Sequence, residues 1–168
     1  MSKLLKITRL LMPLAVLSLA ACGFQLQTKV ELPPEMQRTR LEVQSPYSEF
    51  ARRLETHLEQ NGVKVVTGLE NAAVLEVPVN DMRKEIQSIG DNARVREFLI
   101  RHTVQFRLID SKGVEMIPMQ SFEQSRIYTF NEQDILAAER EDEFLRKDLS
   151  DAMARMVVRR LGTYGSSP

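Results

Sequence analysis

The chain has 168 residues, 23 basic and 23 acidic side chains, and a single cysteine. Its length suits one domain with a hydrophobic core. Its balanced charge excludes nucleic acid as a partner attracted by bulk electrostatics, and one cysteine cannot form an internal disulfide.

Residues 1–21 have the three parts of a cleaved export signal. Lys3, Lys6 and Arg9 form a basic start, and an apolar run from Leu10 to Ala20 follows. The run is shorter than the roughly 20 apolar residues that span a bilayer. We therefore expect a signal peptide and no transmembrane helix here.

The run Leu19-Ala20-Ala21-Cys22 resembles the lipobox of bacterial lipoproteins. The resemblance implies cleavage before Cys22, a diacylglycerol on its thiol and an acyl group on its new amino terminus. Two or more acyl chains anchor a protein stably, whereas one binds only marginally. Gly23 stands where lipoproteins kept at the inner membrane commonly carry Asp, so the resemblance favours an outer-membrane protein that faces the periplasm. The alternative is an ordinary secreted protein with a chance cysteine.

Cleavage would leave residues 22–168, which is 168 − 21 = 147 residues. It would remove three of the 23 basic side chains and no acidic one, so the mature chain would carry 20 − 23 = −3. A domain of negative net charge can meet an anionic ligand only through a local basic patch.

The first half of the mature chain reads as a tether followed by mixed elements. A polar stretch ends at Pro33-Pro34, and Thr39 to Val43 alternates as a strand does. Ser45-Pro46 predicts a helix start and Asn61-Gly62 its end. Strands are expected at 63–66 and 73–79, with Pro78 marking a sheet edge or a bulge; residues 82–89 continue extended into a turn at 90–92.

The second half predicts a hairpin and a long helix. Residues 97–110 alternate between apolar and polar faces, 110–113 form a turn, and a partner strand runs over 114–130. A helix is expected over 135–161, with i,i+4 ion pairs at Asp142–Arg146 and Glu143–Lys147. Gly162 is expected to stop it, leaving 162–168 as a disordered tail. The predicted fold is α+β: one domain over 22–161, with a small mixed or antiparallel sheet of about four strands and two helices packed on one face.

The sequence offers no recognisable catalytic or metal-binding motif. No HExxH spacing, GxSxG elbow or phosphate-cradling glycine loop is present. His57 and His102 lie on different elements and are read as structural. We therefore predict a binding or scaffolding protein that has no metal or cofactor and is not an enzyme.

Basic side chains gather at two places. Arg94 and Arg96 flank the turn before the long strand, with Arg101 and Arg107 along its polar face; they could contact phosphate groups or be merely solvated. A second group near the end of the last helix is explained by the helix dipole: Arg155, Arg159 and Arg160.

Taken in order, several short segments resemble the LptE (RlpB) family of lipopolysaccharide-assembly lipoproteins. They are Cys22-Gly23-Phe24-x-Leu26, Asn61-Gly62-Val63, Glu97-Phe98, Ser125-Arg126-Ile127-Tyr128-Thr129-Phe130, Ile135-Leu136-Ala137-x-Glu139-x-Glu141 and Arg159-Arg160-Leu161. The resemblance implies an α/β domain inside the lumen of the outer-membrane barrel LptD, where it supports barrel assembly, plugs the pore and helps deliver lipopolysaccharide to the outer leaflet.

The resemblance also implies lipopolysaccharide-contacting residues. A basic residue near the turn before the long strand maps to Arg94 or Arg96. A lysine that follows the Leu-Ala pair of the last helix in relatives falls on Ala138, a departure for which Arg140 is the candidate substitute. Two other functions remain open: an outer-membrane lipoprotein that scaffolds or activates another barrel or a peptidoglycan enzyme, and a periplasmic hydrolase.

Overall fold

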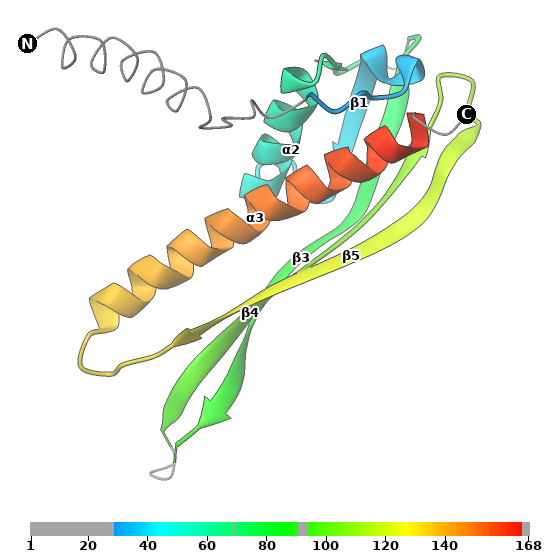
Figure 1. The fold of residues 1–168 in the computed structure, drawn as a ribbon. Helices are drawn as coiled ribbons and strands as arrows, with labels where there is room; N and C mark the ends of the chain where they lie inside the picture. The colour runs from blue at the N-terminus through cyan, green and yellow to red at the C-terminus, as the bar shows by residue number, and fades with distance from the viewer. Residues whose placement is uncertain (1–28, 69, 91–93, 166–168) are drawn as a thin grey trace, which may run out of the picture.

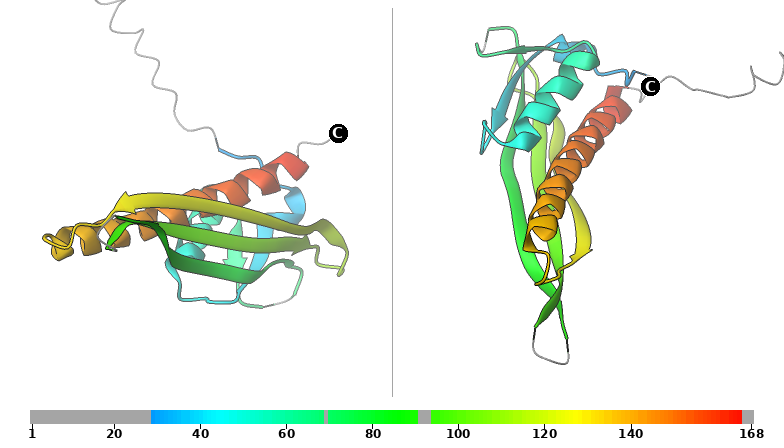
Figure 2. Two further views of the ribbon diagram at one scale, coloured as in Figure 1. Left: turned by 90° about the horizontal axis from the view of Figure 1, so that it is seen from below. Right: turned by 90° about the vertical axis from the view of Figure 1, so that its left-hand side faces the viewer.

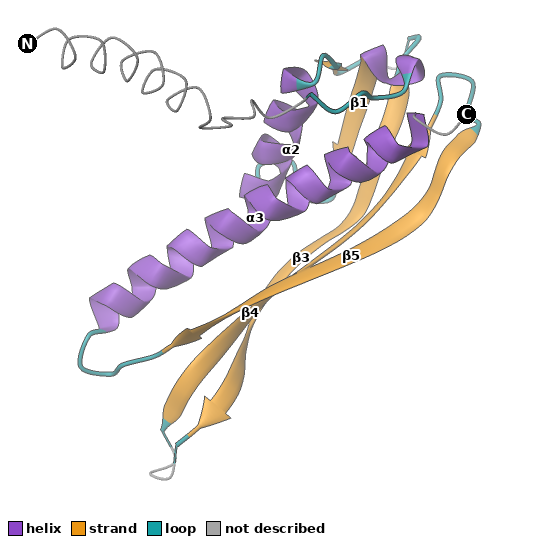
Figure 3. Cartoon of the chain, in the orientation of Figure 1, coloured by secondary structure: helices purple, strands orange, loops and turns teal. Residues whose placement is uncertain are grey.

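A computed structural model describes residues 29–68, 70–90 and 94–165. The signal segment, Cys22 and Gly23 lie outside the described residues. The elements, shown in Figures 1 and 3, are the 3-10 helix η1 (Pro34–Gln37), β1 (Arg38–Val43), α2 (Glu49–Gln60), β2 (Lys64–Val66), β3 (Ala73–Ile89), β4 (Val95–Ile109), β5 (Glu115–Thr129) and α3 (Ile135–Gly165).

The strands form one mixed sheet in the order β2-β1-β3-β4-β5. β1 pairs in parallel with both β2 and β3, whereas β3, β4 and β5 form an antiparallel meander. The expected α+β class is confirmed. The sheet has five strands instead of about four, because every predicted strand, including the short edge strand Lys64–Val66, pairs within the same sheet.

Both helices cover the same face of the sheet, as the sequence predicts (Figure 2). α3 runs obliquely along the meander, and the paired ends of β3 and β4 extend beyond the helices. Alternation along β4 explains this arrangement, because Ile100, Val104 and Phe106 are fully buried on the helix side. Burying a side chain of this size contributes about 1.5–3 kcal/mol.

The main core joins α2, the sheet and the second half of α3. The first helix contributes Phe50 and Leu54, and α3 contributes Met153 and Val157. These residues fall at helical spacing, so each helix turns one apolar face toward the core.

A polar network fastens the first half of α3 to the sheet beside a smaller apolar cluster. Asp142 of α3 accepts a hydrogen bond from the Tyr128 hydroxyl (2.9 Å) and forms an ion pair with Lys84 (3.0 Å). Arg146 pairs with the same carboxylate in the predicted i,i+4 arrangement. The Lys84 ammonium also lies 4.1 Å from the centre of the Phe98 ring. Burial alone would raise the pKa of Asp142, but the hydrogen bonds from Arg146, Lys84 and Tyr128 together lower it.

The expected start of the first helix is wrong by three residues. Ser48, not Ser45, is the N-cap, and its hydroxyl accepts the Ala51 N–H (3.2 Å). The backbone carbonyl of Ser45 accepts the Ser48 N–H in a turn (3.1 Å), and Pro46 lies inside that turn. The helix end is confirmed, because Gly62 adopts the left-handed φ of 91° that favours glycine.

Gly162 does not stop the last helix, which continues to Gly165. The part of the expected tail over 162–165 is therefore helical. Gly162 serves a close approach: a Cβ there would lie 2.2 Å from the Cγ1 atom of Val30. Val30 fills the space that a side chain at position 162 would occupy, so the glycine is required by packing and not by chain reversal.

Pro78 lies at a bulge, one of the two positions predicted for it. β3 is an interior strand, and its pairing with β4 shifts register between Glu76 and Val79. The bulge removes the need for an N–H donor at the proline.

The polar network predicts a specific loss of stability for Asp142→Asn. The amide cannot hold the charges of Lys84 and Arg146, so the free energy of unfolding should fall by about 1–2 kcal/mol in urea titrations at neutral pH. Because the pKa of Asp142 is lowered in the fold, its contribution is present above about pH 4 and is lost as the pH falls through the lowered value. The difference in the free energy of unfolding between the parent protein and Asp142→Asn should shrink over the same fall in pH.

Glu143→Gln is the matched control. Glu143 is the next residue, and it forms an i,i+4 ion pair with Lys147. The Glu143 side chain is 68% exposed and the Lys147 side chain is 54% exposed. The loss there should stay below about 0.5 kcal/mol. Equal losses for the two variants would show that the network does not fasten α3.

Candidate functional site

The predicted basic residues Arg94 and Arg96 meet in one surface cavity of about 460 Å³ at the free end of the sheet. Arg94 directly precedes β4 and Arg96 lies at its start, and the loop that follows β5 supplies Phe130, Asn131 and Glu132. The structure therefore brings the turn and the β5–α3 loop, which are about 35 residues apart, into one site.

Backbone pairing places the two arginines. The Gly90 N–H donates to the Arg94 carbonyl (2.8 Å) and closes the hairpin, and the Phe130 N–H donates to the Arg96 carbonyl (2.7 Å). Pairing between β3 and β4 shifts register between Ser88 and Ile89, which leaves Arg96 without an opposed residue on β3. This bulge next to a site is a common way to re-aim a side chain. Phe130 stands edge-on to Phe98 at 5.3 Å between ring centroids and so anchors the loop.

The ion pair in this cavity is exposed to solvent, so an anionic ligand can replace its carboxylate. Arg94 pairs with Glu132 at 2.6 Å, but the two side chains are 64% and 46% exposed. A pair this exposed contributes at most about 1 kcal/mol, so a phosphate group can compete for the arginine. Arg96 is also exposed. Guanidinium groups bind phosphate through two parallel N–H donors, which gives this site chemistry for an anionic ligand.

Arg140 does not line this cavity. It is exposed on α3, whereas Ala138 is buried and packs in the smaller apolar cluster. Two residues along a helix correspond to a rotation of about 200°, so Arg140 projects away from the position that Ala138 occupies. The structure thus brings together two of the three candidate residues.

Arg101 and Arg107 are engaged across the strands of the outer sheet face. Arg101 bridges Glu85 of β3 (3.3 Å) and Glu123 of β5. Arg107 pairs with Glu76 at 2.6 Å, and hydrogen bonds to these carboxylates raise the pKa of both guanidinium groups. Their charges are balanced locally, so they are poorer phosphate ligands than Arg94 and Arg96.

Both histidines have structural partners. His57 contacts Asp151 at 2.8 Å, and burial together with Arg155 lowers its pKa. His102 is fully buried, contacts Asn80 Oδ1 at 2.9 Å, and burial lowers its pKa. Across the described ranges, no group of three or more His, Cys, Asp and Glu side chains stands close enough to hold a metal ion.

The sequence reading missed an exposed apolar surface near the same end of the domain. Leu136 and Phe144 of α3 are each 67% exposed, and Ile86, Ile89 and Ile127 of the sheet are more than half exposed. Phe144 does not lie on the apolar face that α3 turns toward the core. Its position in the helical pattern was the signal from which the exposed apolar surface could have been predicted. No helix in the described part of the chain is long and apolar enough to cross a membrane.

The family model for LptE, described as lipopolysaccharide-assembly, matches residues 37–161. A Yersinia enterocolitica protein named LPS-assembly lipoprotein LptE is 31% identical over 159 residues, which cover 93% of this chain and 75% of that protein. A Photorhabdus laumondii protein of the same name is 28% identical over 159 residues, covering 94% and 86%.

Solved structures show the same fold. The solution structure of an uncharacterized lipoprotein B from Nitrosomonas europaea superposes with a TM-score of 0.73 at 28% identity, covering 86% of this chain and 94% of that one. A minor lipoprotein from Acinetobacter baumannii gives a TM-score of 0.65 at 21% identity, covering 76% and 92%. The family match spans most of the chain, including β4, β5 and the first half of α3 around the cavity, and the chain therefore belongs to the LptE family of lipopolysaccharide-assembly proteins.

Proposed function

We propose that this protein is an outer-membrane lipoprotein that complexes with an LptD-type barrel, supports its assembly, plugs it and helps deliver lipopolysaccharide to the outer leaflet. The observation that carries the proposal is the family match over residues 37–161, together with relatives named LPS-assembly lipoproteins. Cys22 is the proposed site of lipid attachment, and Gly23 at the following position favours the outer membrane.

Two surfaces of the domain support a barrel partner. The outer sheet face carries charged bridges centred on Arg101 and Arg107, which suits the polar interior of a large outer-membrane barrel. The apolar side chains near the start of α3, Ile135, Leu136 and Phe144, are more than half exposed. Large apolar side chains left exposed on one helix are candidate contacts for a partner.

We propose a binding role without catalysis. The family is named for assembly and not for a reaction. The runner-up, a scaffold or activator of another barrel or of a peptidoglycan enzyme, would use the same fold and anchor, so the identity of the stable partner separates the two.

The cavity predicts how lipopolysaccharide binding depends on charge. Arg94→Ala/Arg96→Ala should weaken binding of lipopolysaccharide to the anchor-free mature domain about tenfold. Each exposed arginine–phosphate contact is expected to contribute somewhat under 1 kcal/mol, and about 1.4 kcal/mol together is a factor of ten. The difference should shrink as salt is added, because exposed charges are screened. Titration with purified lipopolysaccharide measures it.

Arg52→Ala/Arg53→Ala is the control for the same loss of charge. Both arginines pair with Glu49 on α2 and are 62% and 46% exposed. Binding should change less than about twofold in this control. An equal loss in both double variants would refute a local site at the hairpin end.

Lipid attachment at Cys22 predicts that Cys22→Ala abolishes incorporation of a radiolabelled fatty acid into the protein in growing cells. Undiminished labelling of the mutant would rule out Cys22 as the modified residue.

A further inference from the structure

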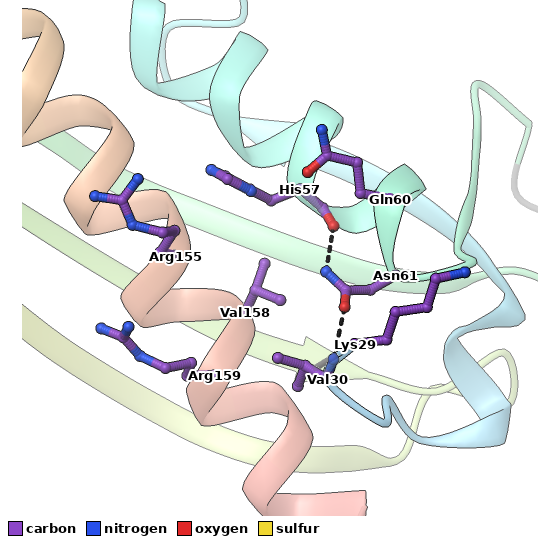
Figure 4. A pocket seen from close by; sticks show the side chains of 8 residues that line it. All are labelled: Lys29, Val30, His57, Gln60, Asn61, Arg155, Val158 and Arg159. Carbon is purple, nitrogen blue, oxygen red and sulfur yellow. Dashed lines mark hydrogen bonds between the residues drawn. The ribbon is translucent and has the colours of Figure 1, made fainter. Parts of the chain in front are cut away.

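The end of the domain opposite the hairpin carries a second basic surface, which the proposed function does not use. A cavity of about 360 Å³ lies between the end of α2, the second half of α3 and the segment that enters the fold at Lys29 and Val30 (Figure 4). Arg155 and Arg159 project from successive turns of α3 in the same direction, and Lys29 lies on the other side of Asn61.

The charge of this surface is only partly balanced. Asp151 contacts both His57, at 2.8 Å, and Arg155. Neither Lys29 nor Arg159 has an acidic partner among residues 29–68, 70–90 and 94–165. Three cations and one carboxylate thus give a positive surface on a chain whose 23 basic and 23 acidic residues balance overall.

The N-terminal segment is fastened at this surface. Asn61 Oδ1 accepts the Val30 N–H at 2.7 Å, and Asn61 Nδ2 donates to the His57 carbonyl at 2.7 Å. The Val30 side chain occupies the space left open by Gly162 of α3. Val30 is therefore held at a fixed point beside the cations.

That fixed point limits the distance to the proposed anchor. Cys22 precedes Val30 by eight residues, a segment that spans at most about 28 Å when fully extended. If the thiol of Cys22 carries lipid, this end of the domain stays close to the headgroup layer. Tyr164 of the last turn of α3 is 43% exposed, and tyrosine is enriched at membrane–water interfaces.

We propose that Lys29, Arg155 and Arg159 form a contact surface for the phosphate groups of anionic membrane phospholipids. The cations stand on two sides of the cavity, which suits a layer of headgroups better than one enclosed ion. The surface orients the domain on its membrane, so that the hairpin end points away from the anchoring leaflet. The inference rests on the proposed lipid anchor at Cys22.

The test uses the mature chain with Cys22→Ala, because an acyl anchor would attach every variant to lipid. The replaced residue lies outside the described residues 29–68, 70–90 and 94–165. Sedimentation with phosphatidylcholine vesicles that contain phosphatidylglycerol should show binding, and vesicles of phosphatidylcholine alone should show much less. Lys29→Ala/Arg159→Ala should weaken binding roughly 25-fold, or about fivefold for each cation near an anionic surface.

Arg52→Ala/Arg53→Ala removes the same charge at the start of α2 and should change vesicle binding less than about twofold. An equal loss in this control, or equal binding to both kinds of vesicle, would overturn the proposal. Displacement of the chain from vesicles by inorganic phosphate, where chloride at the same ionic strength displaces none, would also overturn it, because the cavity would then be a site for a single ion.

Failure here can be told apart from failure of the proposed function. Fatty-acid labelling of Cys22 reports the anchor, and lipopolysaccharide titration reports the hairpin site. Normal results in both, with no binding to anionic vesicles, would overturn only the phospholipid surface.

Discussion

The packing of α3 against a single face of the sheet is the constraint on which the rest of the structure depends. Leu149, Met153 and Val157 are fully buried along the helix, and Asp142 fastens its first half through Lys84 and Tyr128. Because both helices lie on that face (Figure 2), the opposite face must be stable in contact with polar surroundings. The carboxylate bridges of Arg101 and Arg107 meet that requirement.

The same helix separates two chemically different ends. With 31 residues, α3 spans about 45 Å at 1.5 Å per residue. One end of the domain presents Arg94 and Arg96 beside a loop anchored by Phe130, and the other holds the N-terminal segment at Val30. In the proposed function, a rigid spacer of this length would let one end contact an anionic ligand while the other stays near the anchoring membrane.

The sequence predicted the local features well and the long-range ones poorly. Alternation gave β4 and β5, and helical spacing gave both apolar stripes, because these patterns depend on neighbours in the chain. The strand order β2-β1-β3, the cross-strand partners of Arg101 and the network around Asp142 depend on register and tertiary contact. Gly162 shows the same limit: its helix-stop signal is local, whereas its contact with Val30 joins opposite ends of the chain. Arg94 and Arg96 were found because a turn places them, but their cavity required the β5–α3 loop.

The central claim is that this domain works inside a complex with an outer-membrane barrel. Native mass spectrometry of the mature lipoprotein, extracted from outer membranes in mild detergent, tests it most directly. The account predicts one copy of the chain bound to one copy of a large β-barrel protein, with little free chain. Recovery of the lipoprotein alone, or in a stable complex with a peptidoglycan enzyme, would contradict the account.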